Sequence, residues 1–276
     1  MSAPQAPASA VTAATPAASA TAATDYDLLV DIGNTFIKWG RYRAGYPTAE
    51  EAQIDSERRL LDEIPSMGPA FASYPQPRHI VVSNVAGTRI RNRLLRAIEL
   101  WSGVTPNWVA SSPQLCGVTN GYRNPAQLGT DRWAALIGAH ALLPEQPVLV
   151  VVCGTATTID LLTPEGHFAG GNILPGMGLM LRSLHTSTAA LPDADGEYVN
   201  HPDHTVDAIT SGCQHAQAGA IERLFRRHRA EYVELKCLIS GGAGKTVAPR
   251  LAIPYRYHDN LVLEGLYQIG RGMSAG

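Results

Sequence analysis

The chain has 276 residues, of which 45% are hydrophobic and 17% charged, and its formal net charge is −2. This length is enough for one large domain or two modest ones, and the composition is that of a globular chain with a real core. A nearly neutral chain without a basic stripe is a poor candidate for sustained nucleic-acid binding, which needs many clustered cations.

The first 24 residues are almost wholly Ala, Thr, Ser and Pro. They cannot bury enough apolar surface to order themselves, so we expect residues 1–24 to be a disordered extension. They lack the positive start and apolar core of a signal peptide, and no run of the sequence reaches the roughly 20 apolar residues of a membrane span. Four scattered cysteines without a CxxC pair or zinc-ligand spacing favour a reducing compartment, so we expect a cytoplasmic protein.

Order is expected to begin near Asp25. Residues 27–34 and 36–44 are predicted to form two strands that meet in a hairpin turn, and 78–85 a further strand. The apolar spacing of residues 89–101 predicts a helix, which is followed by a short strand at 107–110. A strong helix is predicted at 130–143, with Thr130 as its N-cap.

The pattern then starts again. Three strands are predicted within 147–175, joined by a Gly-Thr turn and a Pro-Glu-Gly turn, and helices are predicted at 178–191 and 206–232. A strand within 235–244 leads into a glycine turn, and a helix at 260–273 closes the chain. The arginines between 223 and 229 alternate with apolar residues, which is typical of the solvent-facing side of an amphipathic helix.

Glycine and small polar residues occupy the first hairpin tip of each half, in "DIGNTFIK" and in "CGTATTID". Two halves whose tips face each other would form a clamp around a cleft, although two ordinary hairpins are the alternative, since Gly and Asn are common in turns. Backbone N–H groups of a tight turn at Gly33 can bind a phosphate, and Lys38 can add a charge. Asp31 would repel phosphate unless a cation intervened, so we expect it to hold Mg²⁺ through water.

Two more segments carry chemistry. "SGGAGKT" is not a P-loop, because Ile239 stands where that motif needs a glycine, and it is interpreted as a glycine turn that an adenosine can approach. "GTDRWAAL" places Asp131 and Arg132 at a helix start, where the helix dipole alone favours an acid. The carboxylate can also accept a proton from a hydroxyl that attacks phosphorus, and the guanidinium can bind an acidic substrate.

Assembled, these segments resemble the type III pantothenate kinases, a family within the superfamily of actin-like ATPases and sugar and acetate kinases. The resemblance extends from Asp27 to the C-terminal helix and rests on "DIGNTFIK", "GTDRWAALIGA", "GTATTID", "GGNILPGMGLMLRSLHTSTAALP" and "SGGAG", in that order. It implies an α/β fold of two ribonuclease-H-like lobes, residues 25–143 and 144–276, with ATP and Mg²⁺ in the nucleotide cleft between them. It also implies a homodimer.

The resemblance further implies which residues form the site. The first phosphate loop would comprise Asp31, Ile32, Gly33, Asn34, Thr35, Phe36, Ile37 and Lys38, and Thr155 would contact the nucleotide from the second loop. Pantothenate would be bound by Tyr122, Gly129, Thr130, Asp131, Arg132 and Thr205, the last serving the site of the partner subunit. Asp131 would be the general base, and Arg132 would bind the carboxylate of pantothenate.

One position departs from the family pattern. Val152 stands where the family has an aspartate that helps to bind a monovalent cation. We therefore expect this chain to lack the usual K⁺ or NH₄⁺ site or to build it differently.

The expected function is transfer of the γ-phosphoryl group of ATP to the 4′-hydroxyl of pantothenate, the first step of coenzyme A biosynthesis. Two alternatives stay open at this point. One is a kinase of another small hydroxylated acceptor on the same fold, such as a sugar kinase. The other is a nucleotide-binding accessory or regulatory protein without catalysis, a role to which members of the family have been linked.

Overall fold

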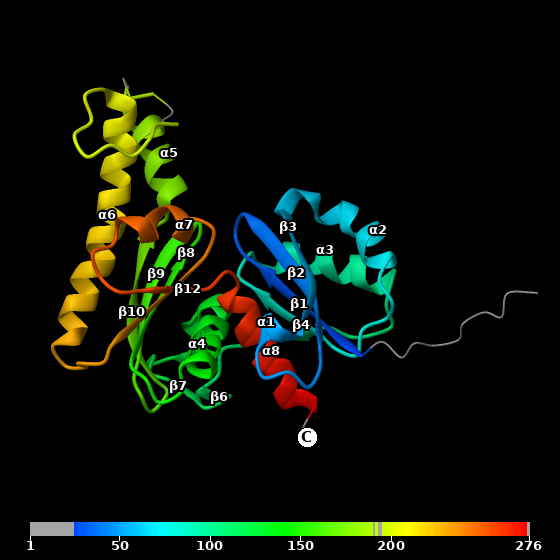
Figure 1. The fold of residues 1–276 in the computed structure, drawn as a ribbon. Coiled ribbons are helices and arrows are strands. Elements are labelled where there is room, and N and C mark those ends of the chain that lie inside the picture. The colour runs from blue at the N-terminus through cyan, green and yellow to red at the C-terminus, as the bar shows by residue number, and fades with distance from the viewer. Residues whose placement is uncertain (1–24, 190, 193–194, 275–276) are drawn as a thin grey trace, which may run out of the picture.

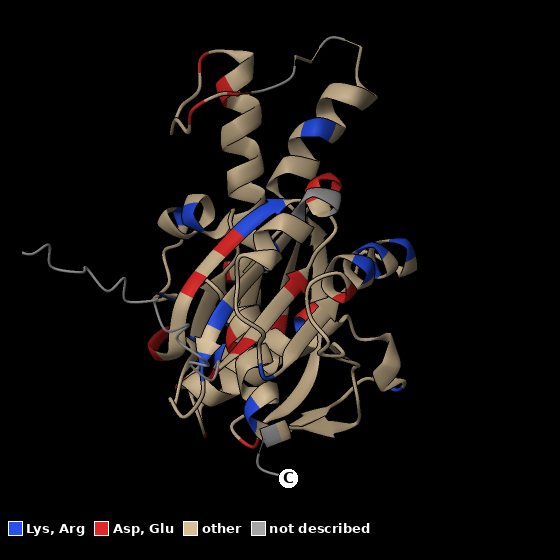
Figure 2. Cartoon of the chain, turned by 90° about the vertical axis from the view of Figure 1, so that its right-hand side faces the viewer, with Lys and Arg blue, Asp and Glu red and all other residues tan. Residues whose placement is uncertain are grey.

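A computed structural model describes residues 25–189, 191–192 and 195–274. The predicted extension, residues 1–24, lies outside the described residues. Figure 1 shows two α/β lobes with helices α4 (Thr130–Leu142) and α8 (Leu261–Ser274) between them. Helices α5 (Met177–Ser187) and α6 (Thr205–Arg229) project beyond one lobe. Charged residues of both signs are interspersed along the chain rather than gathered on one face (Figure 2).

The first sheet has the strand order β3-β2-β1-β4-β5. Its strands are β1 (Tyr26–Ile32), β2 (Phe36–Arg43), β3 (Gln53–Leu60), β4 (Ile80–Asn84) and β5 (Asn107–Trp108). Side chains alternate between the two faces of a strand. Leu28 and Val30 of β1 therefore pack into a core with α2 (Met67–Ala72) and α3 (Thr88–Glu99), while Leu29 packs into the core that contains α8.

The second sheet has the order β12-β11-β8-β9-β10-β7-β6. Its strands are β6 (Gln114–Leu115), β7 (Val118–Asn120), β8 (Val148–Cys153), β9 (Ala156–Leu162), β10 (His167–Pro175), β11 (Lys236–Ser240) and β12 (Arg256–Tyr257). β8 is apolar throughout because both of its faces are buried. Leu149 and Val151 pack with Ile221 and Phe225 of α6, and Val150 packs in the core with α4.

Glycines allow α4 and α8 to cross at close range. A Cβ added at Gly265 of α8 would lie 1.8 Å from the carbonyl oxygen of Ala134, and one at Gly138 of α4 would lie 2.6 Å from that of Leu261. The two helices thus join the lobes through a shared core. The short helices α1 (Ala49–Ala52) and α7 (Gly244–Val247) and the 3-10 turns Leu61–Ser66, Pro125–Gln127 and Ala248–Arg250 complete the described elements.

Each predicted strand and helix has a counterpart in the described structure, whereas the short elements α1, α2, α7, β6, β7 and β12 and the 3-10 turns were not predicted. The predicted N-cap Thr130 is wrong: Gly129 is the N-cap, and Thr130 is the first helical residue. The strand β3, residues 53–60, was not predicted, because "QIDSERRL" is mostly exposed and lacks apolar alternation. The sheets also divide the chain differently from a boundary after residue 143, since β6 and β7 belong to the second sheet and α8 packs on the first.

Two further observations concern the cysteines and the helices. All four cysteines are free thiols, and three of them are buried. No helix in the described part of the chain combines the length and the apolar character needed to cross a membrane.

Candidate active site

The two hairpin tips meet at the interface of the lobes. The Oγ1 atoms of Thr35, between β1 and β2, and of Thr155, between β8 and β9, are 2.8 Å apart and share a hydrogen bond. Beside them lies a cavity of about 400 Å³, here called the central cavity, which both tips line. Its wall also includes Asp31, Lys38, Asp131 and Arg132. The structure therefore brings the first loop, the second loop and the acid of α4 to one place.

Both tips are held in shape by backbone contacts. Gly33 N donates to Phe36 O (3.0 Å) and Gly154 N donates to Ala156 O (2.9 Å), so each hairpin closes as a tight turn. Gly176, before α5, donates its N–H to Thr155 O (3.0 Å). A Cβ at Gly176 would lie 2.2 Å from the carbonyl oxygen of Gly154, so only glycine fits behind the second tip.

Asp31 is the carboxylate at the end of β1. Its cross-strand partner is Lys38, and its Oδ1 atom is buried without a hydrogen-bond partner among the described residues. Burial, the largest cause, and the nearby Asp131 carboxylate together raise the pKa of Asp31 to about 7, and Lys38 opposes this increase. Burial likewise lowers the pKa of Lys38. A buried oxygen without a partner has the donor chemistry that a hard divalent cation prefers.

Asp131 lies in the first turn of α4. Its Oδ1 accepts the backbone N–H of Arg132 at 2.8 Å. A Cβ at Gly129 would lie 2.7 Å from this oxygen, so glycine makes room for the carboxylate. Burial raises the pKa of Asp131, while the hydrogen bond from Arg132 opposes that increase.

The start of α4 is fixed to the first lobe through Thr130. Its Oγ1 accepts the backbone N–H of Asn84 at 3.2 Å and shares a hydrogen bond with Ser83 Oγ at 3.0 Å. Ser83 and Asn84 end β4, so this threonine sets the position of Asp131 relative to the first sheet.

Arg132 is buried, and each of its three guanidinium nitrogens donates a hydrogen bond. Its Nε donates to Asp160 Oδ2 at 3.1 Å, a second guanidinium nitrogen binds Asp160 Oδ1, and Nη1 donates to Tyr122 Oη at 2.8 Å. Arg132 is 6% exposed and Asp160 1%. A Cβ at Gly171 of β10 would lie 1.8 Å from Asp160 Oδ1, so the glycine leaves space for the pair. Sequence reasoning missed Asp160, although a lone acid inside the buried strand "ATTIDLL" signals a partner.

Thr205 is placed elsewhere. It does not line the central cavity but a separate apolar groove of about 580 Å³ between α5 and α6, together with Met180, Leu184 and Ile209. Val152 of β8 does line the central cavity, beside its cross-strand partner Thr158, whose Oγ1 is buried without a partner in the described chain. Within the described ranges no group of three or more His, Cys, Asp or Glu side chains could hold a metal ion.

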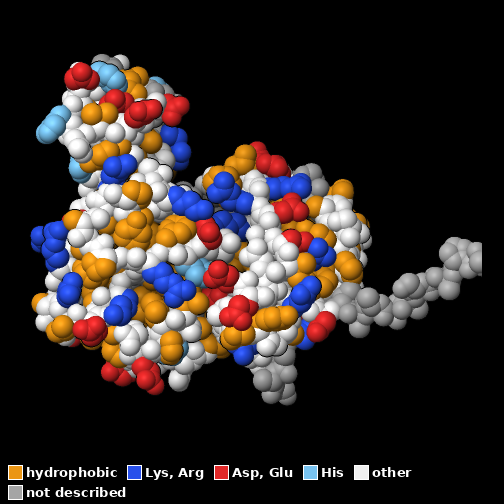
Figure 3. Space-filling model, viewed as in Figure 1, with side chains coloured by type: hydrophobic (Ala, Val, Ile, Leu, Met, Phe, Trp, Pro, Cys, Tyr) orange, Lys and Arg blue, Asp and Glu red, His pale blue; other side chains and the backbone are white. Residues whose placement is uncertain are grey.

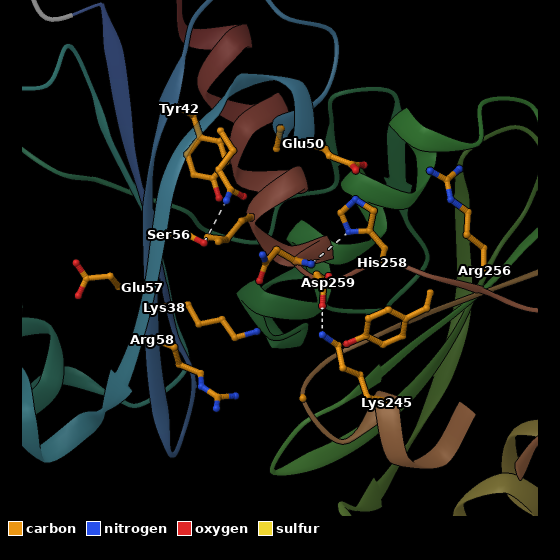
Figure 4. A pocket seen from close by; sticks show the side chains of 16 residues that line it. Lys38, Tyr42, Glu50, Ser56, Glu57, Arg58, Lys245, Arg256, His258 and Asp259 are labelled. Carbon is orange, nitrogen blue, oxygen red and sulfur yellow. Dashed lines mark hydrogen bonds and ion pairs between the residues drawn. The ribbon is translucent and has the colours of Figure 1, made fainter. Parts of the chain in front are cut away.

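A second, lateral cavity of about 850 Å³ adjoins the central one. It lies between β2, β3 and α1 on one side and α7 and residues 256–260 on the other (Figure 4). In Figure 3 basic side chains gather in the hollow between the lobes. Lysine and arginine residues that line the two cavities are Lys38, Arg58, Arg132, Arg182, Lys245 and Arg256.

Comparison with known proteins shows the family of this chain. Residues 27–227 match a family model described as Type III pantothenate kinase. A protein named Type III pantothenate kinase from Aromatoleum aromaticum is 48% identical over 244 residues, covering 88% of this chain and 97% of the relative. The chain belongs to the type III pantothenate kinase family. A second relative of the same name, from Methylibium petroleiphilum, is 43% identical over 249 residues, with 88% and 97% covered.

Solved structures share the fold at low sequence identity. A Campylobacter jejuni protein described as a Baf family transcriptional activator has a TM-score of 0.57 and 20% identity, over 90% of this chain and 100% of its own. A Sinorhizobium meliloti protein described as a 2-dehydro-3-deoxygalactonokinase has a TM-score of 0.57 and 14% identity, over 90% and 99%. These similarities confirm the expected two-lobed α/β fold.

Proposed function

We propose that this protein is a pantothenate kinase that transfers the γ-phosphoryl group of ATP to the 4′-hydroxyl of pantothenate, the first step of coenzyme A biosynthesis. Membership of the type III family supports this function. The observation that carries it is the meeting of Asp131, Thr35 and Thr155 at one cavity. A hydroxyl, a base and two phosphate-binding turns are what in-line phosphoryl transfer needs in one place.

Asp131 is the general base of the proposed reaction. Its carboxylate takes the proton of the pantothenate hydroxyl as that oxygen bonds to the γ-phosphorus and the bond from this phosphorus to the bridging oxygen breaks, releasing ADP. Burial raises the pKa of Asp131, which makes it a stronger base than an exposed aspartate. Gly129 and the Arg132 N–H hold the carboxylate in place, so orientation contributes to the rate.

The donor is proposed to bind along the first loop, Asp31 to Lys38, and at Thr155. Backbone N–H groups of the two tight turns and the Lys38 ammonium would hold the phosphates. Asp31 would hold Mg²⁺ through water, and its buried Oδ1 without a described partner fits that ion. Mg²⁺ supplies charge neutralisation on the phosphate oxygens.

Pantothenate is proposed to lie against the start of α4, in contact with Tyr122, Gly129, Thr130 and Arg132. Asp160 and the Tyr122 hydroxyl already accept bonds from the guanidinium of Arg132. A bond from Arg132 to the pantothenate carboxylate would therefore use the N–H groups of Arg132 that these bonds leave over. Thr205 would complete the site of a partner subunit in a homodimer. Its position in the apolar groove between α5 and α6, away from the central cavity of its own chain, supports this role.

An ADP-release assay with purified protein, ATP and Mg²⁺ tests the function. ADP release should require pantothenate, and a panel of sugars and other hydroxylated acids should be poor acceptors. Preference for a sugar would identify a different kinase on this fold. ATP binding without pantothenate-dependent ADP release would support an accessory or regulatory protein.

The same assay, run in K⁺ and in Na⁺ buffer, tests the cation requirement. Because Val152 replaces the expected aspartate, activity should be similar in both. Strict K⁺ dependence would contradict this part of the proposal. We also propose a cytoplasmic location, because free thiols stay reduced there.

A further inference from the structure

Arg58 of β3 is an arginine at the junction of the two cavities, and neither the family motifs nor the proposed site includes it. It lines both the central and the lateral cavity, as do Lys38, Gly242, Asn260 and Leu263. In Figure 4 Lys38 and Arg58 extend side by side from β2 and β3 into the lateral cavity. A group passing from one cavity to the other would therefore pass this arginine.

Arg58 stands directly opposite Lys38 in the antiparallel pair of β2 and β3. Two like charges at facing positions destabilise a sheet unless an anion compensates them. Within the described chain Arg58 forms no ion pair, whereas Lys245 in the same cavity is bound to Asp259 at 2.7 Å. Glu57, next to Arg58, is engaged with Arg59 at 3.2 Å and with the Tyr74 hydroxyl at 3.1 Å.

The guanidinium of Arg58 is also oriented toward the opposite lobe. Its central carbon lies 4.6 Å from the centre of the Phe36 ring, at the base of the first hairpin tip. A Cβ added at Gly242, in the glycine turn after β11, would lie 3.3 Å from Arg58 Nη1. Arg58 thus spans from the first hairpin to the glycine turn of the second lobe, and the missing side chain of Gly242 leaves it room.

We propose that Arg58 is a further binding residue for the phosphate chain of ATP, which it contacts where the two cavities join. Guanidinium groups bind phosphate oxygens in pairs, and an arginine held by an aromatic ring loses less freedom on binding. Arg58 and Lys38 would then both contact the phosphates from the side of β2 and β3. This inference rests on the proposed function only in taking ATP as the ligand.

Equilibrium binding by calorimetry tests the proposal without turnover. The protein is titrated in Mg²⁺ with a non-hydrolysable ATP analogue and, separately, with adenosine. Arg58→Ala should weaken binding of the ATP analogue roughly tenfold, near the lower end expected for one charged hydrogen bond, and leave adenosine binding unchanged. Arg58→Lys, which keeps the charge but not the paired donors, should fall between wild type and Arg58→Ala.

Arg59→Ala is the matched control. Arg59 is the next residue of β3, lies over the Trp39 ring and is bound to Glu57, and it lines neither cavity. This variant should bind the analogue as wild type does. Thermal melts of all variants should show that the exposed Arg58 can be replaced without loss of fold.

Three results would overturn the proposal: unchanged affinity of Arg58→Ala, an equal loss for adenosine, or an equal loss in Arg59→Ala. The kinase function is contradicted separately if Arg58→Ala binds the ATP analogue more weakly than wild type does, but wild type releases no ADP with pantothenate. If wild type binds no nucleotide, both the role of Arg58 and the kinase function are contradicted.

Discussion

At the scale of single residues, two aspartates that line the central cavity and Asp160, which binds the lining residue Arg132, are held in three different ways. Asp160 forms an ion pair with the Arg132 guanidinium, Asp131 accepts a hydrogen bond from a backbone N–H, and Asp31 has a buried oxygen without a partner in the described chain. Different surroundings give carboxylates of one type different roles. The pattern fits a structural acid, a base and a cation-binding acid.

Replacement of the proposed base should abolish catalysis without unfolding the chain. Asp131→Asn keeps the size of the side chain and its acceptor for the Arg132 N–H. We expect kcat to fall roughly 100- to 10,000-fold, the range that general base catalysis contributes. Steady-state ADP release measures the loss, and nucleotide binding by calorimetry should stay near wild type. Turnover close to wild type would exclude the base role.

The raised pKa of Asp31 predicts a pH-dependent stability in metal-free buffer. The folded-state pKa of about 7 lies above the ordinary value of 3.8, so the folded chain binds the extra proton between these values. The stabilisation is therefore complete at acid pH and is lost as the pH rises from about 4 to about 7. Asp31→Asn cannot ionise, so it should avoid this loss.

Thermal melts in EDTA at pH 5 and pH 8 measure the effect. Relative to wild type, Asp31→Asn should gain more at pH 8 than at pH 5, with a Tm at pH 8 higher by roughly 2 °C or more. Asp62→Asn, at an exposed position, should shift neither melt. An equal shift of Asp31→Asn at both pH values would contradict the raised pKa.

At the scale of elements, the sequence was informative where a strand is buried on both faces or a helix has one apolar face. Apolar runs predicted β1, β8 and β11, and 3.6-residue spacing predicted α3 and α6. The strand β3 was not predicted because it is an exposed edge strand whose charged side chains face solvent and the cavities. The position of Arg58 beside the cavities was therefore not predicted either, since no sequence pattern shows which strand an isolated polar segment will pair with.

The site was predictable in its motifs but not in its ion pairs. Asp31, Lys38, Asp131 and Thr155 stand in short segments whose residue types suggest phosphate chemistry, and the fold places all of them on one cavity. The bond between Arg132 and Asp160 joins α4 to β9, 28 residues apart in sequence. Local spacing carries no information on such a contact, because only the packing of α4 on the second sheet creates it.

The crossing of α4 and α8 predicts a position-specific effect of adding one methyl group. Gly265→Ala would place a Cβ 1.8 Å from the carbonyl oxygen of Ala134, so the helices must separate. We expect a loss of roughly 1–3 kcal/mol of unfolding free energy. Gly272→Ala in the same helix has open space around its Cβ and should be neutral or slightly stabilising. Urea unfolding of both variants measures the difference, and equal effects would argue against the close crossing.

At the scale of the whole molecule, the lobes are interleaved along the chain. β6 and β7 precede α4 yet pair in the second sheet, and α8 ends the chain yet packs with the first. The central cavity takes its walls from both sheets and both crossing helices. A change in the angle between the lobes would therefore change the distance between the first hairpin tip, at Thr35, and the second, at Thr155.

The proposed homodimer predicts that two inactive variants restore each other. Asp131→Asn and Thr205→Val should each be poorly active alone, because each site needs Asp131 from one subunit and Thr205 from the other. After subunit exchange in an equal mixture, half of the dimers are mixed and each has one intact site, so about a quarter of all sites should work. ADP release by the mixture measures this. No recovery, despite mixed dimers seen by mass, would show that Thr205 serves its own chain.

The place of α8 has a consequence for the nascent chain. Leu29 and Val81, on one face of the first sheet, share a core with Leu266 and Ile269 of the last helix. Until the ribosome has released α8, the part of that core which α8 supplies is missing, and the apolar side chains of this face of the first sheet are open to chaperones or to other unfinished chains. Synthesis must therefore pass α8 before the core on this face of the first sheet can close.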